Sequence, residues 1–107
     1  MTDLDLLMAL IAREWKCDET RYPELAGMTI PQKRNFLLKH SVLHITKTNG
    51  KLATICEDFD HNGELTNDDE MQLQVIAVKM FINALKLAEG VEMSPRALLA
   101  RAPNYVQ

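Results

Sequence analysis

The sequence predicts an all-α protein, a bundle of four to five helices that forms a single domain over residues 1–107. Three observations support this fold class. Apolar residues recur at helical spacing in three long segments. A hydroxyl residue that can act as an N-cap precedes each of them. No stretch alternates between apolar and polar residues for long enough to indicate a strand. With 47% hydrophobic residues, the chain can form a core.

The first helix is expected from the N-terminus to about residue 16. Thr2 is a good N-cap, and Asp5 stands three residues later, where a capping-box partner belongs. Helical spacing then connects the apolar residues Leu4, Leu7, Met8, Ile11 and Trp15. Residues 17–29 contain Pro23 and Gly27 and are expected to form an irregular connection.

The second helix is expected to begin after Thr29, with Gln32 as its capping partner and Pro31 in the first turn. Asn49-Gly50 is a strong turn dipeptide, so the helix either breaks there or holds Gly50 for a packing reason. Apolar residues resume helical spacing beyond this dipeptide, at Leu52, Ile55 and Cys56. This spacing favours a continuous helix.

The third helix is capped by Thr66 and has acidic residues in its first turn, where the helix dipole favours negative charge. It is apolar over most of its circumference between Leu73 and Leu87. Such a helix is either central and buried or partly covered by another subunit. We therefore expect a homodimer or a higher homo-oligomer.

The C-terminal region is expected to hold one more short helix. Gly90 is the predicted C′ residue that ends the third helix. Ser94 and Pro95 then open a helix over residues 96–101, which stops before Pro103.

Composition and charge limit the function classes. The net charge is −3 with both signs spread along the chain, which gives no electrostatic basis for binding nucleic acid. The acidic N-terminus does not resemble a signal peptide, and the apolar run from Val75 to Ala88 is interrupted and too short to span a bilayer. Cys17 and Cys56 have no metal or redox spacing and are expected to be buried or part-buried thiols. A cytoplasmic protein without nucleic-acid or membrane partners is expected.

Residues 58–69 have the ligand order of an EF-hand calcium loop, with Gly63 at the sharp turn. This interpretation requires the second helix to end just before the loop. Position twelve carries an aspartate rather than the usual longer glutamate, and no second loop exists to pair with it. The alternative is an ordinary acidic connection between helices. The candidate ligands for Ca²⁺, or for Mg²⁺ with retained waters, are Asp58, Asp60, Asn62, Glu64 and Asp69.

A second candidate site consists of basic residues on two helices. One face of the second helix carries the ligand candidates His40, His44, Lys47 and Lys51. The third helix carries a polar stripe of Lys79, Asn83 and Lys86. If the two stripes face each other, they line a basic cleft suited to a phosphate or a carboxylate without a metal. Otherwise both stripes face solvent.

The two histidines have two further interpretations. They are one helical turn apart and could bind zinc, with His61 or an acid as the third ligand. They could instead be hydrogen-bonded at a helix interface.

The helices in order resemble the MazG-like all-α nucleoside triphosphate pyrophosphohydrolases over roughly residues 35–102. Lys47-Thr48-Asn49-Gly50-Lys51-Leu52 stands where that family has Glu-Glu-x-Gly-Glu-Leu. Leu87-Ala88, Gly90-Val91-Glu92-Met93 and the segment 94–99 match its C-terminal part. The resemblance implies a helical bundle with a magnesium site made by carboxylates from two helices.

The matching positions here are Lys47, Thr48 and Lys51 on one helix, and Ile76 and Lys79 on the other. Ammonium groups cannot ligate a cation, so the catalytic activity is not carried over. The favoured hypothesis is a catalytically degenerate relative that binds a small anionic, nucleotide-like ligand or a protein partner. One alternative is a calcium-binding module. The other is an active pyrophosphohydrolase with relocated ligands, drawn from Glu57, Asp58, Asp60, Asp68, Asp69 and Glu70.

Overall fold

The computed structural model describes residues 1–14 and 18–106. Over these ranges it has four α-helices, two 3₁₀ segments and no strand. The all-α prediction is therefore confirmed. The α-helices are α1 (Asp3–Glu14), α2 (Ile30–Asn62), α3 (Asn67–Gly90) and α4 (Pro95–Arg101), and the 3₁₀ segments are η1 (Pro23–Leu25) and η2 (Ala102–Tyr105).

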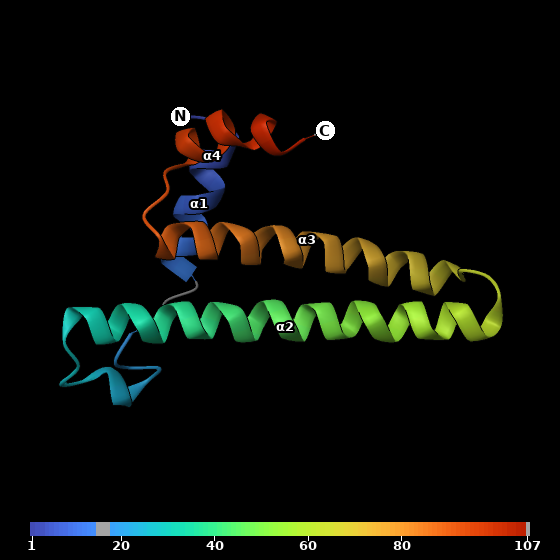
Figure 1. The fold of residues 1–107 in the computed structure, drawn as a ribbon, viewed down its shortest axis with the longest axis horizontal. Helices are drawn as coiled ribbons and strands as arrows, with labels where there is room; N and C mark the ends of the chain where they lie inside the picture. Colours follow the sequence, from blue (N-terminus) through green and yellow to red (C-terminus); the bar gives the residue numbers. More distant parts are fainter. Residues whose placement is uncertain (15–17, 107) are drawn as a thin grey trace.

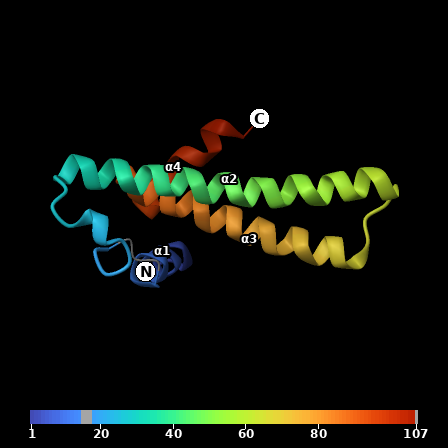
Figure 2. The same ribbon diagram turned by 90° about the horizontal axis from the view of Figure 1, so that it is seen from below.

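The two long helices α2 and α3 form an antiparallel hairpin that sets the shape of the protein (Figure 1). The view from below again shows them side by side (Figure 2). α1 contacts α3 and α4 at the end of the hairpin that holds both termini, away from the turn between α2 and α3. The radius of gyration is 16.8 Å, against about 13 Å for a compact chain of this length. The half of the hairpin near its turn is thus a two-helix structure.

Local capping explains where the helices begin. Thr2 and Asp5 hydrogen-bond reciprocally, with Thr2 N–H donating to Asp5 Oδ2 over 2.9 Å and Asp5 N–H donating to Thr2 Oγ1 over 3.1 Å. Complete capping boxes start α2 at Thr29 and α3 at Thr66. These helix starts were predicted correctly. The described part of α1 ends at Glu14, so the predicted extension over residues 15 and 16 lies outside the described residues.

α2 is continuous through Asn49-Gly50, as the apolar spacing favoured. The proposed packing reason for Gly50 is wrong. A Cβ atom built on this residue meets no other group within 4 Å. α2 therefore continues through Gly50 although no close packing requires a glycine there.

The end of α2 differs from the expectation. The helix runs to Asn62, and Gly63 follows in the left-handed conformation, with φ of 80° and its N–H donating to the Phe59 carbonyl. A glycine in this conformation is a common helix terminator because it has no Cβ to clash. Local turn chemistry was correctly recognised at Gly63, but the helix boundary before Asp58 was wrong.

The end of α3 also needs a correction. Gly90 is the last helical residue, and the left-handed residue is Glu92, with φ of 62°. Met93 N–H donates to the Ala88 carbonyl over 2.9 Å and Glu92 N–H to the Glu89 carbonyl over 3.0 Å, which is the Schellman arrangement. Gly90 has a different role. A Cβ there would lie 3.2 Å from Leu38 Cδ2, so the glycine lets α3 approach α2 closely.

The interior of one chain is small. The buried apolar residues of the described ranges are Ile11, Leu25, Ile55, Ile76, Leu85 and Ala88. α3 is not buried around its circumference as predicted for a central helix, because Val75, Val78 and Phe81 are 52%, 57% and 51% exposed.

α3 also passes, on length and composition alone, the test for a membrane-crossing helix, with 24 residues and a mean hydropathy of 1.2. The apolar part of α3 is therefore longer than the run from Val75 to Ala88 that the sequence analysis considered. The core helix of a soluble protein passes the same test, although only 22% of this window is buried here.

Candidate functional site

The two polar stripes predicted on α2 and α3 face each other across a shared hollow of about 260 Å³. α2 contributes the basic residues His44, Lys47 and Lys51, and α3 contributes Lys79. The other lining residues are Thr48, Ile82 and Asn83. We call this hollow the basic cleft. The lysines are exposed, yet their side chains gather around one space rather than diverging into solvent.

A buried polar contact fixes the register of the two helices beside the cleft. Asn83 Nδ2 donates to Thr48 Oγ1 over 2.9 Å and approaches the His44 carbonyl at 3.4 Å. Asn83 and Thr48 are only 5% and 7% exposed. Because an unpaired buried amide would be costly, this contact favours the register that brings Lys79 opposite Lys47 and Lys51.

The cleft is electropositive because three lysines line it. Repulsion from Lys79, and then from Lys47, lowers the pKa of Lys51 below its ordinary value. The ion pairs found within the described ranges are Arg13–Glu14, Lys33–Glu19 and Lys86–Glu89, so none includes a cleft lysine. Among the residues that the structure describes, no carboxylate lines this hollow. An anion entering it would meet several ammonium groups and no negative side chain.

A second hollow of about 280 Å³ continues from the cleft and shares Lys51 and Lys79 with it. Its walls include Gln72, and its one carboxylate is that of Asp58. The two lysines therefore lie between a purely basic compartment and one of mixed charge.

The structure separates some residues that the sequence grouped. Lys86 does not line the basic cleft, because it lies at another hollow with Lys33 and Glu89 and pairs with Glu89 at 3.6 Å. His40 is also outside the cleft lining but contacts His44, with their Nε2 atoms 3.2 Å apart. Burial, followed by the charges of His40 and Lys47, lowers the pKa of His44.

Tyr22 is a functional candidate that sequence reasoning missed. Its hydroxyl oxygen lies 2.7 Å from His40 Nε2, and its ring meets the His40 ring edge-on with centroids 4.8 Å apart. Tyr22 lies in the connection before η1, and 18 residues separate it from His40. No local sequence pattern could have indicated this contact.

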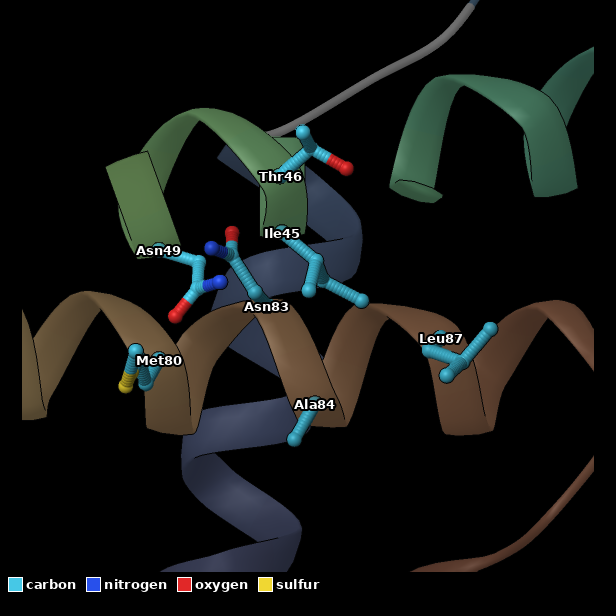
Figure 3. A pocket seen from close by; sticks show the side chains of 7 residues that line it. All are labelled: Ile45, Thr46, Asn49, Met80, Asn83, Ala84 and Leu87. Atoms are coloured by element: carbon cyan, nitrogen blue, oxygen red, sulfur yellow. The ribbon is translucent and has the colours of Figure 1, made fainter. Parts of the chain in front are cut away.

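An apolar groove of about 380 Å³ also lies between α2 and α3. Figure 3 shows Ile45 and Asn49 of α2 above Met80, Ala84 and Leu87 of α3, with Asn83 between the helices. Asn83 lines both hollows, so its buried amide separates the groove from the basic cleft. Only Asn49, Asn83 and Thr46 are polar here, which makes this groove a poor site for an anion.

The proposed calcium ligands do not form a loop. Asp58, Asp60 and Asn62 all belong to α2. Residues two apart on a helix point about 200° apart around its axis, so Asp58 and Asp60 cannot turn toward one ion. The Asp69 carboxylate instead accepts the Thr66 N–H over 3.0 Å in the capping box of α3. Within the described ranges, no three His, Cys, Asp or Glu side chains cluster closely enough to hold a metal ion.

The thiol prediction was wrong for Cys56, which is exposed. Cys17 lies outside the described residues. Cys56 is not among the residues that line the basic cleft.

Comparison with known proteins gives no relative from which a function could be transferred. No family model matches the chain, and no match was found among curated proteins or solved structures. The MazG-like resemblance therefore stays a prediction.

Proposed function

We propose that this protein binds a small anionic ligand, such as phosphate or a phosphomonoester, in the basic cleft without help from a metal ion. The observation that carries the proposal is the convergence of Lys47, Lys51 and Lys79 from two helices on one hollow that no carboxylate lines. Ammonium groups bind phosphate oxygens as point charges and as hydrogen-bond donors.

The size of the cleft favours a small ligand. Its volume of about 260 Å³ is below the roughly 300–1,000 Å³ of pockets that bury drug-sized molecules. The adjoining hollow with Gln72 and Asp58 could receive an uncharged part of a larger ligand beside the same two lysines. The exposed lysines keep much of their hydration, so we expect a dissociation constant on the order of 0.1–1 mM.

Titration calorimetry of the full chain with inorganic phosphate and pyrophosphate, in buffer containing EDTA, tests the proposal. Binding should occur without metal and should weaken at least fivefold in both Lys51→Gln and Lys79→Gln. Lys39→Gln is the matched control, because it removes the same charge from an exposed position on α2 outside the cleft. No heat with either anion, or an equal loss in Lys39→Gln, would refute a specific site.

We also propose that two copies of the chain associate through α3. Its exposed apolar residues Met71, Val75, Val78 and Phe81 follow helical spacing and so form one stripe. These side chains are exposed, so neither α1 nor α4 covers them in the single chain. Pairing two hairpins across a twofold axis would cover this stripe and complete a four-helix arrangement.

Sedimentation equilibrium tests this association. Val78→Lys places a charge in the centre of the stripe and should shift a dimer to a monomer. Ala53→Lys is a control with the same added charge at an exposed position of α2. A wild-type chain that stays monomeric at about 100 µM, which is on the order of the dissociation constant of a weak dimer, would refute the proposal.

A further inference from the structure

The hollow of about 280 Å³ that adjoins the basic cleft differs from it in chemistry. We call this second space the mixed hollow. Lys51 and Lys79 line both spaces, so a phosphate held by these two lysines lies at the boundary between them. A group attached to that phosphate can therefore extend into the mixed hollow. Apart from the two lysines, its lining residues are Thr54, Ile55, Asp58, Gln72, Val75 and Ile76.

The polar side chains of the mixed hollow offer hydrogen-bond acceptors to a ligand. Thr54 Oγ1 donates its proton to the Gly50 carbonyl over 3.1 Å, so its lone pairs are what it offers. Gln72 Nε2 donates to Asp68 Oδ2 over 2.6 Å, and the amide oxygen of Gln72 stays available to accept. Among the described residues, Asp58 belongs to no ion pair, although it shares the hollow with two lysines. The hollow thus combines a carboxylate, an amide oxygen and a hydroxyl oxygen.

A ligand group that matches these acceptors has to carry several donors. Ammonium and hydroxyl groups both donate hydrogen bonds. Lys51 and Lys79 repel a further positive charge at this short range, which disfavours an ammonium group. Hydroxyl groups are neutral and are not repelled. The two oxygens of the Asp58 carboxylate can accept from two hydroxyl groups on neighbouring carbon atoms at once.

The floor of the mixed hollow suits the carbon skeleton of such a ligand. Ile55 of α2 and Ile76 of α3 line the hollow and are each only 5% exposed, so they form a fixed apolar surface. Thr54 and Asp58 lie one turn apart on α2, and Gln72 lies one turn before Ile76 on α3. Polar atoms from both helices therefore border an apolar floor. This combination is typical of sites that orient a small ligand by a few polar groups.

We propose that the ligand of the basic cleft is the phosphomonoester of a polyol or sugar, with its phosphate on Lys51 and Lys79 and its hydroxyl groups on Asp58. This inference rests on the proposed anion site and names the class of its ligand. Asp58 repels a phosphate that brings no donors, because both carry negative charge. The same carboxylate accepts hydrogen bonds from a ligand that brings hydroxyl groups. Asp58 is therefore the residue that determines the specificity of the site.

Titration calorimetry of the full chain with glycerol phosphate and propyl phosphate, in buffer containing EDTA, tests the inference. The two compounds have the same number of carbon atoms and the same phosphate, and only the first carries hydroxyl groups. Glycerol phosphate should bind about fivefold more tightly, as expected for added hydrogen bonds to an exposed carboxylate. Asp58→Ala should abolish this preference and bind propyl phosphate more tightly than the wild type does. Asp60→Ala is the matched control, because Asp60 is an exposed acid of α2 outside both hollows.

The anion site and the polyol assignment fail in different ways. If the two compounds bind equally to the wild type, if the preference persists in Asp58→Ala, or if Asp60→Ala abolishes it too, the polyol assignment is overturned and the anion site stands. If neither compound binds, the anion site is refuted and the polyol assignment with it. Partial unfolding of a variant weakens both compounds by the same factor, so the ratio of the two affinities remains a valid readout.

Discussion

Replacing Gly50 by alanine should stabilise the protein, although Asn49-Gly50 has the sequence of a turn. Gly50 lies inside α2, and a Cβ atom there meets no other group within 4 Å. Glycine in a helix interior costs about 0.5–1 kcal/mol relative to alanine. With no clash to subtract, the full amount should appear as a gain of about 0.5–1 kcal/mol in the free energy of unfolding. This corresponds to a rise in Tm of about 4 °C.

Urea denaturation followed by far-UV circular dichroism measures the effect, with an unchanged m-value as the criterion for comparable transitions. Gly90→Ala and Gly63→Ala are the comparison variants. The first brings a Cβ to 3.2 Å from Leu38 Cδ2, so its gain should be smaller than that of Gly50→Ala. The second forces alanine into a φ of 80° and should lose about 1 kcal/mol. A destabilised Gly50→Ala would show that α2 is broken at this dipeptide or that another surface packs against it.

Three further outcomes are expected. Thr48→Val removes the acceptor of the buried Asn83 amide and should cost about 1–2 kcal/mol in urea denaturation, whereas Thr54→Val, at an exposed site on α2, should cost less. Phosphate affinity should fall as pH rises. Neighbouring lysines lower the pKa of Lys51 in the free protein, and a bound anion raises this pKa. Phosphate binding therefore takes up protons at pH values between the pKa of Lys51 in the free protein and its pKa in the complex. Calorimetry across alkaline pH checks this, and an affinity that rises with pH would contradict it. Asp58→Ala should leave the heat of a calcium titration unchanged because α2 continues through Asn62, and a specific loss of heat would restore the EF-hand interpretation.

The features that could be predicted from the sequence are those fixed by neighbouring residues. Thr29 and Gln32 form a capping box through contacts three residues apart, and this pair was recognised. At Thr66 the N-cap was recognised, but its partner Asp69 had been assigned to the calcium loop. The end of α2 could not be predicted in the same way. Asp, Asn and Gly have the same turn preferences in a metal loop and at an ordinary helix end, so composition alone could not place the boundary.

Features that depend on contacts between residues far apart in the chain could not be predicted from the sequence. Gly90 was assigned to a helix cap, but its neighbour Leu38 belongs to another helix and gives the glycine a packing role instead. The helical period predicted that Lys47 and Lys51 share a face of the second helix. Whether Lys79 of the third helix lies opposite them depended on how the two helices pack, which the sequence did not predict. The structure meets that condition because Asn83 is buried against Thr48 and sets the register.

The repulsion within the basic cleft distinguishes a binding role from a structural one. Lys51 has a lowered pKa because its charged form is disfavoured beside Lys79 and Lys47, so these charges oppose folding at neutral pH. Lys51→Gln should therefore raise the Tm of the free protein, while it removes the increase in Tm that phosphate produces in the wild type. A lysine that supports the fold would show the opposite sign in the first measurement. Because ligand binding stabilises only the folded state, the two signs together assign Lys51 to the ligand rather than to the scaffold.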